Sequence, residues 1–223
     1  MNFDRALVIA PHPDDDILGV GGFIKKLTNL DCEVIVLTVA GHLPPLYSEE
    51  VFATTVREAE QAHKLVGVAH CEYLKIPATQ IGDVPIGELN GKIMGILNDF
   101  KPSLVLCPFP DRHVDHRLVF DAAMVAARPI GSGLNIKLIA AYETLSETHW
   151  NAPHIECNFV PNWVVDITNT IEVKKQALSC FDSQMSPFPA PRSSKAVEAL
   201  AMFRGTQAGF AYGEGFHIIR MTS

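Results

Sequence analysis

Short apolar runs alternate with longer amphipathic segments along the whole chain. Seven runs predict strands, at residues 6–10, 33–39, 71–76, 103–107, 137–142, 162–166 and 216–221. Six segments with apolar residues at helical spacing predict helices, at residues 17–30, 48–68, 85–100, 115–127, 168–182 and 193–205. Strands that alternate with helices of this length are typical of an α/β fold with a mostly parallel sheet.

Length, composition and charge narrow the classes of protein. The 223 residues are enough for one well-cored domain, and no internal linker is visible, so we expect a single domain over residues 1–223. The formal net charge is −7, without the basic patch that a polyanion requires, and we expect no nucleic-acid partner. Because no apolar run approaches the roughly 20 residues of a bilayer span, we expect no transmembrane segment.

The five cysteines are scattered and odd in number, and they form no C-x-x-C pair. This usage favours reduced thiols over disulfides or a thiolate metal site. The first apolar run also lacks the length and the small-residue cleavage site of a signal peptide. We therefore expect a cytoplasmic protein.

The first apolar run leads directly into Pro-His-Pro-Asp-Asp-Asp at residues 11–16. One imidazole and three carboxylates at the end of a buried strand need a counterion, and a divalent metal of the zinc type accepts both ligand types. His12 and Asp15 could face one ion across a turn, with Asp14 close enough to serve as general base for an activated water. The alternative is an acidic start to the helix that follows, without a metal.

A second polar cluster follows the strand at residues 103–107. It contains His113, Asp115 and His116. Loops that follow parallel strands open at the same edge of the sheet, so the two clusters should be neighbours. His116 is a plausible third metal ligand, while His113 and Asp115 could hydrogen-bond the site or act as its acid. The sequence therefore predicts one zinc-type ion per chain.

A glycine-rich stretch, Gly19-Val20-Gly21-Gly22, also follows the first strand. A dinucleotide loop needs its glycines in the strand-to-helix turn, but that turn holds three carboxylates that would repel a phosphate. We therefore exclude NAD and FAD and expect these glycines to allow close packing of the helix.

The two clusters together resemble a known family. Pro-His-Pro-Asp-Asp-Asp, Leu18-Gly19 and His113-x-Asp115-His116 are similar to the motifs of the PIG-L/LmbE-like zinc-dependent N-acetylglucosaminyl deacetylases. The resemblance implies a Rossmann-like three-layer fold and zinc bound by His12, Asp15 and His116. It also implies Asp14 as general base and assembly into trimers or hexamers.

The same resemblance implies a cationic or acid role for His113, oriented by Asp115. Arg57 and Tyr142 are candidate substrate residues, although a surface ion pair for the arginine and a core position for the tyrosine are alternatives. Asp16 stands where the family usually has Glu. This shorter side chain could alter a contact behind the ligands.

The expected reaction is hydrolysis of the acetamide of an N-acetylglucosamine-type sugar or its conjugate by a metal-activated water. A metallophosphoesterase uses the same ligand types, usually around two metals. A sugar- or metal-binding module without catalysis is a third possibility, and the sequence does not name the rest of the substrate.

Overall fold

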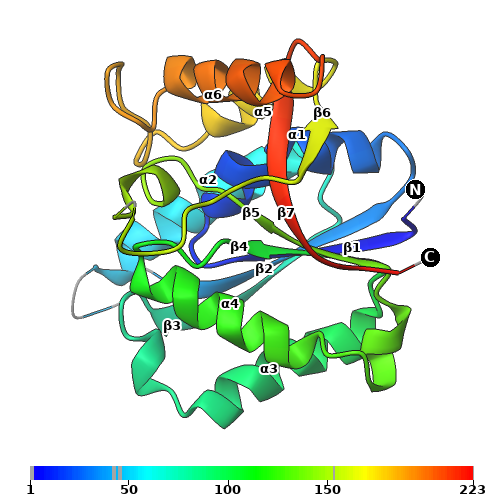
Figure 1. The fold of residues 1–223 in the computed structure, drawn as a ribbon. Helices are drawn as coiled ribbons and strands as arrows, with labels where there is room; N and C mark the ends of the chain where they lie inside the picture. The colour runs from blue at the N-terminus through cyan, green and yellow to red at the C-terminus, as the bar shows by residue number, and fades with distance from the viewer. Residues whose placement is uncertain (1–2, 42–43, 45–46, 153, 223) are drawn as a thin grey trace.

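The computed structural model describes residues 3–41, 44, 47–152 and 154–222 as a sheet with helices on both faces (Figure 1). The strands are β1 (Arg5–Ala10), β2 (Glu33–Gly41), β3 (His70–Pro77), β4 (Leu104–Pro108), β5 (Leu138–Tyr142), β6 (Trp163–Asp166) and β7 (Gly213–Met221). The helices are α1 (Asp15–Thr28), α2 (Glu49–Val66), α3 (Ile86–Phe100), α4 (Val114–Ala126), α5 (Ile171–Leu178) and α6 (Ser194–Thr206).

The strand order is β3-β2-β1-β4-β5-β7-β6. The first five strands in this order are parallel, and β7 runs antiparallel to both of its neighbours. The predicted α/β fold with a mostly parallel sheet is therefore confirmed. The apolar pattern did not predict three short 3-10 helices within the described residues, at Ile81–Asp83, Gly131–Asn135 and Thr148–Trp150. The helix predicted at residues 168–182 is longer at both ends than α5 in the structure. The loop predicted at residues 40–48 lies partly outside the described residues.

The continuous apolar runs are explained by burial on both faces. In β1, Ala6 and Val8 face the layer of α1, α2, α5 and α6, whereas Leu7 and Ile9 face α3 and α4. All four side chains are inaccessible to solvent. Since each buried Leu or Ile contributes about 1.5–3 kcal/mol, this central strand is a rigid base for the loop that follows it.

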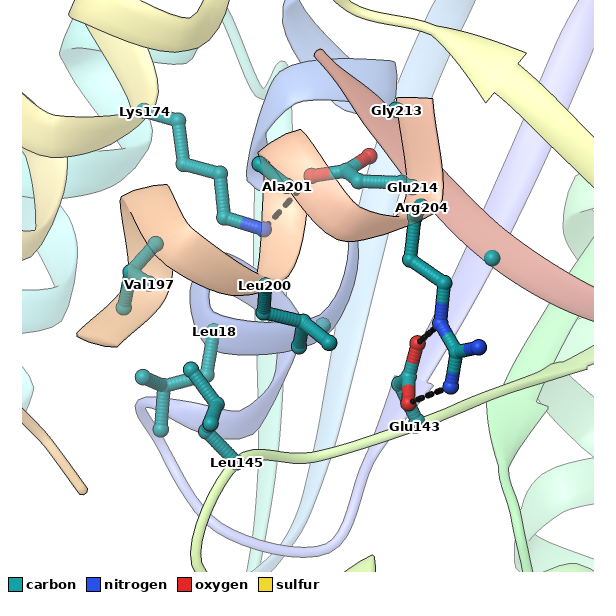
Figure 2. Close-up of a pocket in the computed structure, with 12 residues that line it drawn as sticks. Leu18, Glu143, Leu145, Lys174, Val197, Leu200, Ala201, Arg204, Gly213 and Glu214 are labelled. Atoms are coloured by element: carbon teal, nitrogen blue, oxygen red, sulfur yellow. Dashed lines mark hydrogen bonds and ion pairs between the residues drawn. The ribbon is translucent and has the colours of Figure 1, made fainter. Parts of the chain in front are cut away.

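Helix α1 is broken in its middle, and the break is stabilised from the far end of the chain. Val20 has φ −135° and ψ 15°, which frees the backbone N–H groups of the next turn. Gly22 and Phe23 donate these N–H groups to the Glu214 carboxylate at 2.9 and 2.8 Å. Lys174 reaches the same carboxylate at 2.6 Å (Figure 2). Strand β7 and helix α5 therefore hold α1 in place.

Close packing at Gly19 sets the distance between α1 and the end of β5. A Cβ atom at this position would lie 2.3 Å from Cδ2 of Tyr142. The expected packing role of this glycine is confirmed.

Of the helices in the described part of the chain, none has the length and apolar character needed to cross a bilayer.

Candidate metal centre and active site

The two polar clusters meet at one edge of the sheet. Strands β1 and β4 pair directly and in parallel, with Val8 opposite Leu106. The loops that follow them therefore leave the sheet side by side, as the order of apolar runs and clusters predicts.

His12, Asp15 and His116 converge on one point. Asp15 Oδ2 lies 3.0 Å from His12 Nδ1 and 3.2 Å from His116 Nε2. One ligand atom from each residue falls within 4.8 Å of the others, and all three residues are buried. The structure thus brings together the three residues that the sequence suggested as ligands.

The chemistry of this cluster fits zinc. Two imidazole nitrogens and a carboxylate oxygen are a common ligand set of catalytic zinc, which keeps a further position open. Asp15 Oδ1 is buried and has no hydrogen-bond partner among the described residues, whereas His116 Nε2 faces Asp15 Oδ2 at 3.2 Å. Because an unpaired buried carboxylate oxygen is costly, Asp15 Oδ1 is better satisfied by a cation.

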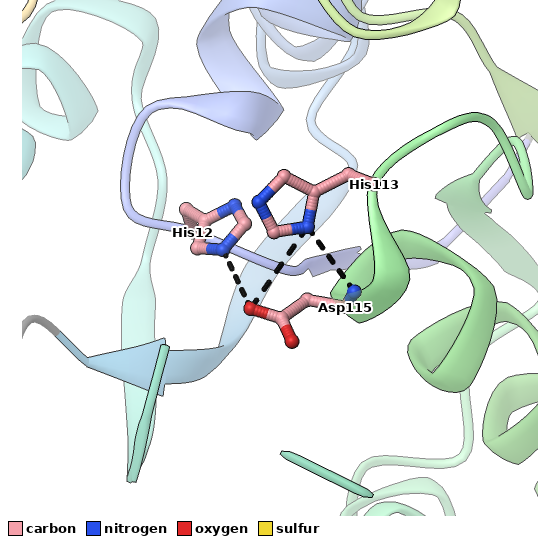
Figure 3. Close-up of side chains that lie close together, drawn as sticks. All are labelled: His12, His113 and Asp115. Carbon is pink, nitrogen blue, oxygen red and sulfur yellow. Dashed lines mark hydrogen bonds and ion pairs between the residues drawn. The ribbon is translucent and has the colours of Figure 1, made fainter. Parts of the chain in front are cut away.

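Each histidine of the cluster is oriented by a carboxylate at its other ring nitrogen. His12 Nε2 lies 3.0 Å from Asp115 Oδ2 (Figure 3), and His116 Nδ1 lies 3.0 Å from Asp111 Oδ2. Thr148 Oγ1 donates to the same Asp111 oxygen at 2.8 Å. Such carboxylates fix the tautomer and the direction of a metal-binding imidazole.

Asp111 was missed by the sequence analysis, although it lies in the second polar cluster. A metal-binding histidine needs a partner at its second ring nitrogen, and this requirement could have indicated Asp111. Asp115 hydrogen-bonds the site, as one expectation had it, through its carboxylate, which lies 3.0 Å from His12 Nε2 and accepts the Thr79 N–H at 2.8 Å, while His113 Nδ1 lies 4.0 Å from the same oxygen.

The protonation of the cluster is strongly coupled to its geometry. Burial alone would lower the pKa of His12, but hydrogen bonds to Asp115 and Asp15 raise it to about 9. Burial likewise opposes a charge on His116, yet Asp15 and Asp111 raise its pKa to about 10. The pKa of Asp15 lies well below its usual value, because the two imidazoles outweigh the effect of burial. The cluster is therefore held together by opposite charges.

Asp14 lines a cleft of about 170 Å³, together with His12 of the cluster. It is the N-cap residue of α1, but its side chain makes no capping hydrogen bond, so the alternative of an acidic cap does not describe it. Arg192 Nη1 donates to Asp14 Oδ2 at 2.5 Å. Burial raises the pKa of Asp14, and the charge of Arg192 opposes this effect. Sequence analysis missed Arg192 because 178 positions separate the two residues.

His113 also lines the cleft, and a backbone contact determines its tautomer. As the N-cap residue of α4 it accepts the Asp115 N–H on Nδ1 at 3.1 Å (Figure 3). Burial, together with the nearby His12 and His116, lowers its pKa. A neutral ring that accepts on Nδ1 carries its proton on Nε2. In that form Nε2 is the ring nitrogen that could donate, which suits the acid part of the role that the resemblance implied.

The two candidate substrate residues do not line this cleft. Tyr142 is fully buried and donates its hydroxyl to the Ile9 carbonyl at 2.9 Å, as in the alternative of a core tyrosine. Arg57 is exposed on α2 and donates to Thr54 Oγ1 at 2.9 Å. Asp16, at the usual position of Glu, lies 2.8 Å from His63 Nε2 behind the ligands.

The α/β fold and this group of two histidines and an aspartate are compatible with a metal-dependent enzyme. The family of GlcNAc-PI de-N-acetylases, PIG-L, matches residues 7–127, more than half of the chain, and the protein therefore belongs to the PIG-L family. The matched part contains both polar clusters.

Two relatives are similar in sequence to this protein over most of its length. A diacetylchitobiose deacetylase of Thermococcus kodakarensis is 27% identical over 96% of this chain and 83% of its own length. A probable N-acetyl-α-D-glucosaminyl L-malate deacetylase 2 of Bacillus anthracis is 25% identical over 70% of this chain and 74% of its own length.

Solved structures give the same fold. The N,N'-diacetylchitobiose deacetylase of Pyrococcus horikoshii, in complex with the inhibitor MPG, has a TM-score of 0.79 and 28% identity, over 98% of this chain and 84% of that one. GalB of Pseudomonas putida KT2440, a 4-carboxy-2-hydroxymuconate hydratase, has a TM-score of 0.78 over 99% and 98% of the two chains, but only 18% identity. The fold by itself therefore does not fix the reaction.

Proposed function

We propose that the protein is a zinc-dependent N-deacetylase. It hydrolyses the acetamide of an N-acetylglucosamine-type sugar, or of a conjugate of such a sugar, to the free amine and acetate. The observation that carries the proposal is the convergence of His12, Asp15 and His116 beside Asp14, which lines a cleft. The names of the T. kodakarensis and B. anthracis relatives describe the same kind of reaction.

The residues of this chain divide the work of amide hydrolysis among them. Zinc held by His12, Asp15 and His116 would supply a water of lowered pKa and a Lewis acid for the carbonyl oxygen. Asp14 accepts the proton that the attacking water releases and passes it to the departing amine. His113 donates its Nε2–H to the acetyl oxygen while negative charge develops there.

We propose one zinc ion per chain. A second group of possible ligands, His12, His113 and Asp115, shares His12 with the first group. In that second group, Oδ2 of Asp115 already contacts His12 Nε2 and accepts the Thr79 N–H. This sharing favours a single metal over the pair that a metallophosphoesterase usually requires.

Acetate release from defined substrates tests the proposed function. The zinc-loaded protein is assayed on N-acetylglucosamine, N,N'-diacetylchitobiose and N-acetylglucosaminyl malate, with p-nitrophenyl phosphate as the phosphoesterase probe. We expect acetate from at least one sugar and no phosphate. Bound zinc without acetate release would favour a binding module, and phosphate release with two metals per chain would favour the phosphoesterase.

We also propose that the chain forms a homo-oligomer, a trimer or hexamer, in the cytoplasm. Large apolar side chains are exposed in the segment between β5 and β6 and in the loop before α6, among them Trp150, Ile155, Val160 and Phe188. Such a surface is suited to a second subunit.

All five cysteines are free thiols, which supports a reducing compartment such as the cytoplasm.

A further inference from the structure

Arg192 forms a largely buried ion pair with Asp14. The side chain of Asp14 is 5% exposed and that of Arg192 is 22% exposed. The attraction within such a pair is screened less by solvent than that of an exposed pair. The contact joins the loop after β1 to the loop before α6.

Several groups fix the guanidinium of Arg192 in turn. Its Nε donates to Ser146 Oγ at 3.2 Å, and Nη1 also approaches Gln184 Oε1 at 3.4 Å. The backbone of the loop is closed by a hydrogen bond from the Ser186 N–H to the Arg192 carbonyl at 2.8 Å. These contacts fix the position of Arg192 independently of its contact with Asp14.

Asp14 lacks the anchor that an N-cap residue usually has, because its side chain does not accept a backbone N–H of α1. Besides a hydrogen bond with its own backbone N–H, the carboxylate is held by Arg192, which contacts Oδ2. In the proposed function, proton transfer would use the other oxygen, Oδ1.

We propose that Arg192 is a positioning residue, which holds the carboxylate of Asp14 in the orientation that proton transfer requires. This role rests on the proposed function, in which Asp14 is the general base. Arg192 acts through Asp14 and does not bind the substrate itself. Because misplacement of a catalytic group by about 1 Å can cost about 100-fold in rate, loss of the arginine should be visible in kcat.

Steady-state kinetics of Arg192→Ala and Arg192→Lys test the role. We expect Arg192→Ala to lower kcat by about 10- to 100-fold, with KM within about twofold and zinc content unchanged. Arg192→Lys should recover part of kcat, since an ammonium keeps the charge but cannot reproduce the fork that reaches both Asp14 and Ser146. Ser146→Ala should give a smaller loss in the same direction. Arg128→Ala is the matched control, because Arg128 is exposed on the surface and bonds to the Val125 carbonyl.

A double-mutant cycle separates positioning from substrate binding. In an Asp14→Asn background, Arg192→Ala should lower kcat by less than about threefold more, because the group through which it acts is already removed. A raised KM in that background, or losses that multiply, would overturn the proposal and indicate a substrate contact.

The two proposals fail in different ways. If the wild-type protein releases no acetate from any substrate, the proposed function fails and the role of Arg192 fails with it. If the wild type is active and Arg192→Ala keeps full kcat, the role of Arg192 alone is overturned. Thermal unfolding of the same variants, measured without substrate, shows whether any loss reflects folding.

Discussion

Two adjacent aspartates of identical chemistry have different surroundings in this protein. Asp15 is completely buried between the imidazoles of His12 and His116, whereas Asp14 faces Arg192 and the cleft. These different contacts suit the two roles that we propose, a ligand position for Asp15 and a position for proton transfer for Asp14.

Exchange of each aspartate for asparagine should therefore have different effects. We expect Asp14→Asn to keep its zinc and to lower kcat by about 100-fold or more, since general-base catalysis supplies a factor of this size. Asp15→Asn should lose zinc, because a ligand carboxylate is removed. Elemental analysis after dialysis and acetate-release kinetics measure both. Zinc loss on Asp14→Asn together with retention on Asp15→Asn would show that the two roles are exchanged.

Asp111 offers a test of the residues behind the ligands. Asp111→Asn removes the charged partner of His116 but leaves all three ligands, and we expect zinc affinity to fall by about 10- to 100-fold. Competition with a chromogenic chelator measures the affinity. Asp121→Asn, on the exposed surface of α4, is the control and should bind zinc like the wild type.

The sequence was informative about the three residues suggested as ligands because residue type and position after a strand are both visible in it. Their surroundings were harder to predict: Asp111 could be found only through the need of His116 for a second partner, and the contact of Arg192 with Asp14 joins residues 178 positions apart. For Tyr142, the position at the end of a strand suggested a place in the site. Its hydroxyl, however, donates to the Ile9 carbonyl, and the sequence does not show this direction.

At the level of helices and strands, the apolar pattern predicted nearly every element, because strands buried on both faces give continuous apolar runs. The break in α1 was not predictable. The stretch around Val20 reads as a weak but continuous helix, and the cap that stabilises the break, Glu214, comes from the last strand.

The contact between α1 and β5 can be tested at Gly19. Gly19→Ala places a methyl group against the Tyr142 ring, which the hydrogen bond to Ile9 prevents from moving, and we expect a loss of about 1–3 kcal/mol in the free energy of unfolding. Gly91→Ala is the matched control, because Gly91 is exposed on α3 and nothing lies within 4 Å of its added carbon. It should raise stability by up to about 1 kcal/mol. Urea denaturation measures both, and equal effects would contradict the packing argument.

For the whole molecule, metal removal should lower the unfolding temperature. Zinc that binds the folded state alone stabilises it by about 2.7 kcal/mol at a free concentration 100 times Kd. Differential scanning calorimetry with zinc and with EDTA measures the shift. The shift should vanish in His116→Ala; a shift that persists there would place the metal elsewhere.

Association is the second property of the whole molecule that can be tested. The exposed apolar side chains at Ile155, Val160 and Phe188 lead us to expect oligomers at micromolar concentration. Multi-angle light scattering gives the mass directly. A mass near 24.4 kDa at all concentrations would contradict the proposal, and Phe188→Ser should weaken any oligomer that forms through this surface.

The break in α1 makes the metal site depend on the end of the chain. His12, Asp15 and His116 all precede residue 117, but the helix that begins with Asp15 is stabilised by Glu214 and its ion pair with Lys174. During synthesis from the N-terminus, at about 5–20 residues per second, these three residues emerge roughly a hundred residues before Glu214. If the proposed site binds zinc, we therefore expect its affinity for the ion to rise only after β7 has docked on α1.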